Sequence, residues 1–179
     1  MTDVNKIVYL LGKMKDLKRS GWVRKDVPNP ESVADHSFGL AMLAFLLTPE
    51  HLDRNKCIKM ALIHDLAEIY VGDITPFDRV APEAKHNMEK EAMDKIAADL
   101  NCPEIAALFE EYEADVSPEA HFMRNLDRAE AILQACYYDD EGRAKSKLLP
   151  EFFEYAEKNI AVKNLVITEI FEAMAAKLQ

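Results

Sequence analysis

The spacing of the apolar side chains is the feature that most narrows the folds open to this chain. Apolar residues recur mostly three and four positions apart, and strict alternation never extends beyond a few positions. The first spacing puts side chains on one face of an α-helix, whereas a half-buried strand needs alternation. Only 5 Gly and 8 Pro interrupt the 179 residues. The sequence therefore predicts an all-α fold, a single compact bundle of amphipathic helices.

Capping residues and prolines predict where these helices begin. A second helix should open near Glu31, and Asp53 can cap a third, which we expect to run on to about Gly72. The apolar stripe expected for the first helix comprises Val4, Ile7, Val8, Leu11 and Met14. Later helices should open at Pro82, Pro103, the Ser117-Pro118 pair and Pro150, before a last one between Leu165 and Leu178.

Length and charge limit the domain count and the partners. A chain of 179 residues suits one domain, spanning 1–179. The 32 acidic against 22 basic residues leave a net charge of −10. Nucleic acids and anionic membranes attract a positive surface, so neither is expected as a partner. A phosphorylated small molecule stays compatible, because a bound metal can reverse the local sign of the charge.

The cysteines and the apolar runs bear on the compartment. The longest apolar run, from Leu40 to Leu47, is too short to span a bilayer, and the N-terminus carries no signal-peptide pattern. The cysteines are scattered, odd in number and without a CxxC pair, which favours a reducing compartment. They are Cys57, Cys102 and Cys136. We therefore expect a soluble, cytoplasmic protein.

Four residues near core-facing stripes could share a divalent cation. His64 and Asp65 are adjacent on the third predicted helix, His36 lies on the second, and Asp127 lies on the helix opened at Pro118. Buried imidazoles and carboxylates cost free energy unless they are paired or ligated. Two imidazoles and two carboxylates without a thiolate favour Mn²⁺, Co²⁺, Fe²⁺, Ni²⁺, Zn²⁺ or Mg²⁺. Such an ion would lower the pKa of a water and polarise a phosphoryl group.

Each of these residues also has a purely structural interpretation. A buried histidine such as His36 can bond to the backbone, and Asp127 can pair with Arg124 or Arg128. The adjacent histidine and aspartate alone form a weak motif. Only the four residues taken together favour a metal site.

Four further residues could bind a substrate or act on it. Glu68 lies four positions after His64, on the same face of the predicted helix, where it could deprotonate a water or protonate a leaving oxygen. Asp73 follows a glycine, where backbone is free to approach a ligand. Arg19 suits bidentate phosphate contact, and Trp22, the only tryptophan, offers a flat face to a sugar or base. Taken singly, these could equally be solvated charges, a turn cap and a packing residue.

The order of the four ligand candidates resembles the H…HD…D signature of the HD-domain metal-dependent phosphohydrolase superfamily. Four sequence words narrow the resemblance. They are RSGW from Arg19, ESVADHS from Glu31, HDLAE from His64 and VGDITP from Val71. Together they resemble the 5′-deoxynucleotidase branch, whose members hydrolyse 2′-deoxynucleoside 5′-monophosphates. The resemblance runs from the first helix to about Tyr155.

This resemblance implies an HD-domain bundle, a homodimer and a role for each candidate residue. One divalent ion, Co²⁺ or Mn²⁺ before the other candidates, would be held by His36, His64, Asp65 and Asp127. Glu68 would be the catalytic carboxylate. Arg19 would hold the phosphate, Trp22 would line the sugar side and help reject ribose, and Asp73 would bind the 3′-hydroxyl.

Two other functions are compatible with the same residues. Another HD phosphohydrolase could act on a cyclic nucleotide, a triphosphate or an alarmone, although the chain lacks extra insertions or a second histidine cluster. A non-catalytic, metal-stabilised binding module is the third hypothesis. Glu68 argues against it, because a structural site has no use for a carboxylate beside an open coordination position.

Overall fold

The computed structural model describes residues 3–160 and 164–178, and every regular element within them is helical. The elements are α1 (Val4–Asp16), α2 (Ser20–Arg24), α3 (Val33–Leu47), α4 (Arg54–Ile63), α5 (Glu68–Val71), the 3₁₀ helix η1 (Pro76–Asp78), α6 (Pro82–Leu100), α7 (Pro103–Ala114), α8 (Pro118–Asp140), α9 (Leu149–Asn159) and α10 (Leu165–Ala176). The all-α prediction is confirmed. None of the helices in this part of the chain is long and apolar enough to cross a membrane.

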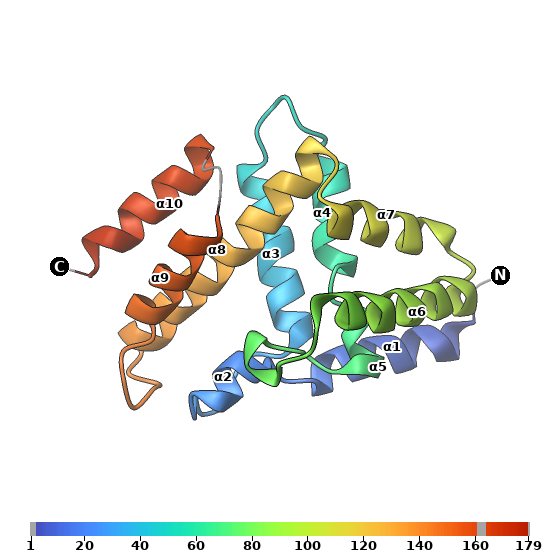
Figure 1. Ribbon diagram of the computed structural model, residues 1–179, viewed down its shortest axis with the longest axis horizontal. Helices are drawn as coiled ribbons and strands as arrows, with labels where there is room; N and C mark the ends of the chain where they lie inside the picture. Colours follow the sequence, from blue (N-terminus) through green and yellow to red (C-terminus); the bar gives the residue numbers. More distant parts are fainter. Residues whose placement is uncertain (1–2, 161–163, 179) are drawn as a thin grey trace.

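Helix α8 organises the larger of the cores. It runs diagonally through the bundle in Figure 1, and α3, α4, α7, α9 and α10 all pack against it. Its fully buried apolar residues include Phe122, Met123, Leu126, Ala129 and Ile132. Residues that neighbour this stripe, such as Asp127 and Glu130, are thereby carried to the edge of the core.

A smaller core forms where α1, α5, α6 and α7 meet. Figure 1 shows α1 and α6 side by side, and the two are in contact. Leu66 and Ala67 belong to this smaller core, whereas Met60 and Ala61 belong to the larger one. The chain therefore passes from one core to the other at residues 62–65, which include the adjacent histidine and aspartate singled out in the sequence.

Local capping fixes several helix starts where the sequence predicts them. The side chain of Asp53 accepts backbone N–H groups at the start of α4, and that of Ser117 does so for α8. A capping box between Ser32 and Asp35 opens α3. These starts are confirmed. Each depends only on residues within one turn, so the sequence alone was sufficient to predict it.

The third predicted helix does not continue to Gly72. Helix α4 ends at Ile63, and the N–H groups of Leu66 and Glu68 then bond to carbonyls three positions back instead of four. These tighter bonds form a turn before α5 begins at Glu68. Helix α5 ends at Val71, and Gly72 follows with a φ of +80° that favours glycine.

The apolar stripe predicted for the first helix is only partly right, because Ile7 and Met14 join the smaller core but its other members do not. Val4, Val8 and Leu11 are exposed, whereas Leu10 and Met14 are buried. The helix meets α3, α5 and α6 through the side that carries Leu10 and Met14. The apolar residues of α1 extend over more than one face, and only the neighbouring helices decide which face is covered.

Candidate active site

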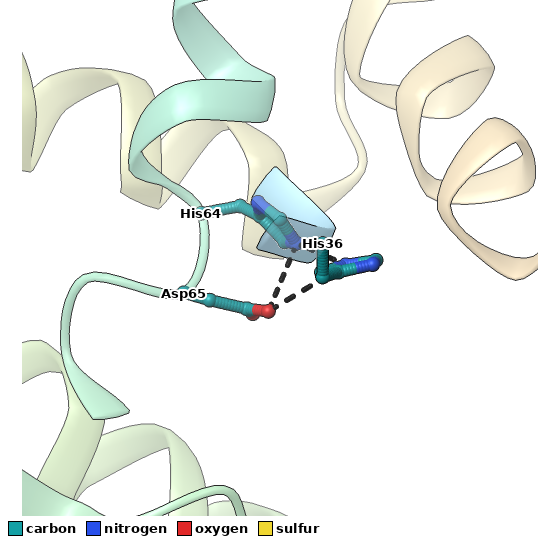
Figure 2. Close-up of side chains that lie close together, drawn as sticks. All are labelled: His36, His64 and Asp65. Carbon is teal, nitrogen blue, oxygen red and sulfur yellow. Dashed lines mark hydrogen bonds and ion pairs between the residues drawn. The ribbon is translucent and has the colours of Figure 1, made fainter. Parts of the chain in front are cut away.

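Three separate segments bring the four predicted ligands together. His36 comes from α3, His64 and Asp65 from the turn after α4, and Asp127 from α8. His36 Nε2 lies 3.3 Å from His64 Nε2 and 3.1 Å from Asp127 Oδ1. Asp65 Oδ2 lies 3.2 Å from His64 Nε2 and 3.7 Å from His36 Nε2. Figure 2 shows both imidazoles and the Asp65 carboxylate pointing toward one another.

The other ring nitrogen of each histidine has its own partner. His64 Nδ1 lies 2.9 Å from the carbonyl oxygen of Ala61, and His36 Nδ1 lies 2.7 Å from Glu130 Oε2. Carbonyl and carboxylate oxygens only accept, so both Nδ1 atoms carry hydrogen. In neutral rings the two Nε2 atoms then present lone pairs to each other at 3.3 Å. That arrangement is repulsive unless a proton or a metal cation lies between the two nitrogens.

The charges around the cluster favour a positive charge at its centre. Burial and Arg19 oppose protonation of His36, but Glu130 and Asp127 outweigh them and raise its pKa well above the ordinary value. Burial alone would raise the pKa values of Asp65 and Asp127, but the neighbouring imidazoles hold both below their usual range. Two imidazoles and two ionised carboxylates are a donor set that divalent ions accept. The residues present therefore fit the divalent ion that the sequence predicts.

Asp127 is held by a residue that sequence reasoning missed. The Tyr112 hydroxyl donates to Asp127 Oδ2 at 3.2 Å, and its ring meets His64 edge-on at 5.4 Å between centroids. Arg124 instead donates to Glu113, and Arg128 donates to the carbonyl of Arg124. The contacts of Asp127 are thus with the other ligand candidates and Tyr112, unlike the arginine pairing considered from the sequence.

Glu68 begins α5 and is almost fully enclosed, with 4% of the residue exposed. Burial, followed by the charges of Asp65 and Asp73, raises its pKa well above the ordinary value. Its Oε2 atom has no hydrogen-bond partner among the residues that the structure describes. The expectation that Glu68 shares one helix face with His64 is wrong, because the turn interrupts that helix. Glu68 still lines the same pocket as His64.

Arg19 and Asp73 lie together on the pocket side of the cluster. Arg19 Nη1 is 3.2 Å from Asp65 Oδ2 and 3.7 Å from Asp73 Oδ1. The other oxygen of Asp73 accepts the backbone N–H of Ser20 at the start of α2. The loop after α5 is thereby joined to the segment that carries Arg19.

Trp22 is mostly a packing residue that still reaches the pocket. It is 3% exposed, its ring stacks on Phe152 with 4.3 Å between centroids, and it meets Tyr138 edge-on. Its indole N–H donates to Glu31 Oε1 at 2.7 Å. The prediction that Trp22 lines the sugar side stays a prediction. Its position in the pocket wall is compatible with that role.

A pocket of about 470 Å³ opens beside the cluster. This volume falls within the range of small-molecule sites. Seven of the eight predicted site residues line it, and His36 lies behind them, fully buried. The wall also carries cations and aromatic rings to which the sequence assigned no substrate role, namely Lys25, Lys85, Arg124, Arg128, Phe77, Phe152 and Tyr155. The acidic protein therefore presents a locally mixed surface with several cations at this one opening.

Comparisons with known proteins agree with this geometry. A family model described as an HD domain matches residues 11–166. The chain is 45% identical to 5′-deoxynucleotidase HDDC2 of Bos taurus, and the match covers 73% of this chain and 65%, just under two thirds, of that protein. It is 41% identical to the protein of the same name from Danio rerio, and that match covers 88% of this chain and 80% of the Danio rerio protein. Among solved structures, the PH0347 protein from Pyrococcus horikoshii OT3 is 34% identical, with a TM-score of 0.81. The match covers 99% of this chain and 100% of that one.

Proposed function

The chain belongs to the HD domain family and to its 5′-deoxynucleotidase branch, and from this we propose that it hydrolyses 2′-deoxynucleoside 5′-monophosphates to deoxynucleoside and phosphate. We propose that residues 1–179 act as one HD domain. The three cysteines are free thiols, which supports a place in the reducing cytoplasm.

One observation carries the proposal. Four donor side chains from three segments converge beside a pocket that also holds a buried carboxylate and an arginine. A site that only stabilised the fold would need neither Arg19 nor Glu68, whose Oε2 atom has no hydrogen-bond partner among the described residues. The combination fits a reaction at a phosphoryl group.

We propose that His36, His64, Asp65 and Asp127 hold one divalent ion, Co²⁺ or Mn²⁺. When bound, this ion would supply positive charge to the phosphoryl oxygens and lower the pKa of a nearby water. The chain contributes the orientation of the donors. The Ala61 carbonyl and Glu130 hold the two imidazoles, and Tyr112 holds Asp127.

Glu68 is the proposed proton-transfer group. Burial and the neighbouring carboxylates raise its pKa well above the ordinary value, and its Oε2 atom has no hydrogen-bond partner among the residues that the structure describes. As water attacks phosphorus and the P–O5′ bond breaks, a carboxyl group held in this way can donate its proton to the leaving 5′-oxygen and take up the proton that the attacking water gives up. Burial keeps bulk water from taking over that exchange.

Arg19, Asp73 and Trp22 are the proposed substrate contacts. Arg19 would bind the phosphate and offset the charge that builds on its oxygens. Asp73 would accept a hydrogen bond from the 3′-hydroxyl. The hydrogen bond that its carboxylate already accepts from the backbone N–H of Ser20 fixes the carboxylate for that purpose. Trp22, immobilised by Phe152, would leave no room for a 2′-hydroxyl.

The experiment that tests the activity measures phosphate release from dAMP, dGMP, dCMP, dTMP and dUMP, with and without Co²⁺ or Mn²⁺. We expect metal-dependent release from the deoxynucleotides and much slower release from the matching ribonucleotides. Absence of metal-dependent release from every deoxynucleotide would refute the function. Equal rates on ribonucleotides would refute the role of Trp22.

Glu68→Gln tests the mechanism separately. We expect it to bind metal as the parent protein does and to lose about 10²–10⁴-fold in turnover. Glu154→Gln is the matched control, because Glu154 is an exposed carboxylate paired with Lys158 on α9. It should leave turnover unchanged. Full turnover in Glu68→Gln would remove Glu68 from the mechanism.

We also propose that two copies of the chain pair through α3. This helix buries one side in the larger core, yet its opposite side exposes Phe38 by 66%, Met42 by 41%, Phe45 by 53% and Leu46 by 63%. A helix that is apolar all round is normally covered on both sides. A second copy of the same face would cover it symmetrically.

Light scattering after size exclusion tests this pairing. We expect a mass of twice 20.3 kDa for the parent protein and a monomer for Phe45→Glu. Val116→Glu is the control, because Val116 is an exposed apolar residue outside α3. A parent protein that is monomeric at micromolar concentration would refute the proposal.

A further inference from the structure

Two carboxylates, buried Glu130 and half-buried Glu31, lie behind His36, on the side away from the other ligand candidates. Glu130 Oε2 lies 2.7 Å from His36 Nδ1, and 8% of the Glu130 side chain is exposed. Ligand atoms of Glu31, His36 and Glu130 all lie within 4.8 Å of one another. Neither glutamate was singled out from the sequence, and neither is among the residues that line the pocket. Their position must therefore serve something other than direct contact with a substrate.

We propose that Glu130 is a positioning residue, which fixes the His36 imidazole so that Nε2 faces the other three ligands. This inference rests on the metal site of the proposed function. A hydrogen bond from Nδ1 to a carboxylate settles which nitrogen carries hydrogen and which is free to bind a metal. It also raises the basicity of the coordinating nitrogen. The imidazole is fully buried, so no solvent molecule can replace this acceptor.

The backbone of α3 leaves space for this contact at Gly39. A Cβ atom built at Gly39 would lie 3.0 Å from Glu130 Oε1. The carboxylate therefore lies directly over the helix backbone, one turn after His36. The glycine and the glutamate together form a fitted pair, in which a missing side chain on α3 accommodates an acidic one on α8.

Glu31 extends the same support toward the pocket wall. Its carboxylate accepts the indole N–H of Trp22, and its backbone N–H donates to the Tyr138 hydroxyl. The two glutamates thus support a proposed ligand on one side and a proposed sugar contact on the other. Only the role of Glu130 is put to the test below, because it alone is bonded to a ligand candidate.

The test is a calorimetric titration of the full chain, freed of metal, with Mn²⁺ alone. Glu130→Gln keeps a side-chain oxygen that can accept from Nδ1 but loses the charge, whereas Glu130→Leu loses both. We expect Mn²⁺ affinity to fall in the order parent, Gln, Leu, with a loss of about 10–100-fold for Leu. The Gln variant is nearly isosteric, so it remains informative if the Leu variant does not fold.

Ile132→Val is the matched control. Ile132 is a fully buried apolar residue of the same helix that belongs to the larger core and does not line the pocket, so this change should lower the melting temperature and leave Mn²⁺ affinity within about twofold. Equal affinity in the parent and both folded Glu130 variants would overturn the inference while leaving the metal site intact. A parent protein that binds no Mn²⁺ would overturn the metal site, and this inference with it.

Discussion

Replacing Gly39 by alanine sets two effects of known size against each other. In a helix interior, alanine is more stable than glycine by about 0.5–1 kcal/mol. At Gly39, however, the new Cβ atom would lie 3.0 Å from Glu130 Oε1. The carboxylate would have to move by a few tenths of an ångström, and its second oxygen is already bonded to His36 at 2.7 Å.

The cost of that movement exceeds the gain in helix propensity. A hydrogen bond to a charged group contributes about 1.5–3 kcal/mol, and a displaced carboxylate in this enclosed position has no water to turn to. We therefore expect Gly39→Ala to destabilise the protein by about 1 kcal/mol in net terms. For a chain of this size that corresponds to a melting temperature about 2–4 °C lower.

Gly12→Ala provides the matched comparison. Gly12 lies within α1 and is exposed, and a Cβ atom added there would meet nothing within 4 Å, so only the propensity gain applies. We expect Gly12→Ala to raise the melting temperature, measured by circular dichroism without metal, and Gly39→Ala to lower it. Mn²⁺ affinity should fall several-fold in Gly39→Ala alone. If both variants were stabilised equally, with unchanged Mn²⁺ affinity, the reasoning about the fitted pair would be refuted.

Three further changes have expected outcomes. Burial, followed by the charge of Glu130, raises the pKa of Glu31 to about 7, so folding favours the protonated form and stability falls as pH rises from about 4.5 to 7. Urea unfolding of the metal-free protein should show Glu31→Gln more stable than the parent by about 3 kcal/mol at pH 8 and equal to it at pH 4; the same difference at both would contradict this. Ser32→Ala removes the cap of α3 and should cost about 1 kcal/mol, whereas the exposed Ser146→Ala should cost nothing measurable. Leu126→Ala opens a cavity in the larger core and should cost about 2–5 kcal/mol by the same assay; a loss below about 1 kcal/mol would mean that α8 is not central to packing.

The parts of the fold that depend on short-range chemistry could be predicted from the sequence. Asp53 and Ser117 cap their helices through bonds that span only a few positions, so the sequence contains everything needed. The turn after Ile63 could not be predicted in this way, because no glycine or proline marks it. It follows instead from the passage of the chain between two cores, which is a tertiary requirement.

The candidate site divides along the same line. The four ligand candidates were found because their residue types and order form a pattern, and the structure places them together. Tyr112 was missed, because a tyrosine in an apolar stripe carries no sign of the aspartate it will meet across the bundle. Glu130 had a weak signal in its spacing of three from Asp127, which puts both on one side of a helix.

The ligand candidates come from segments that lie far apart along the chain. This separation decides when the cluster can be completed during synthesis. His36 and His64 are only 28 positions apart, but His36 and its partner Glu130 are separated by 94. During translation, α3 and α4 leave the ribosome well before α8, so a nascent chain presents two imidazoles without the acidic groups that complete their surroundings. The same late helix supplies much of the larger core. If the proposed metal site is correct, tight binding of an ion therefore has to wait for the same segment, α8, that completes the larger core.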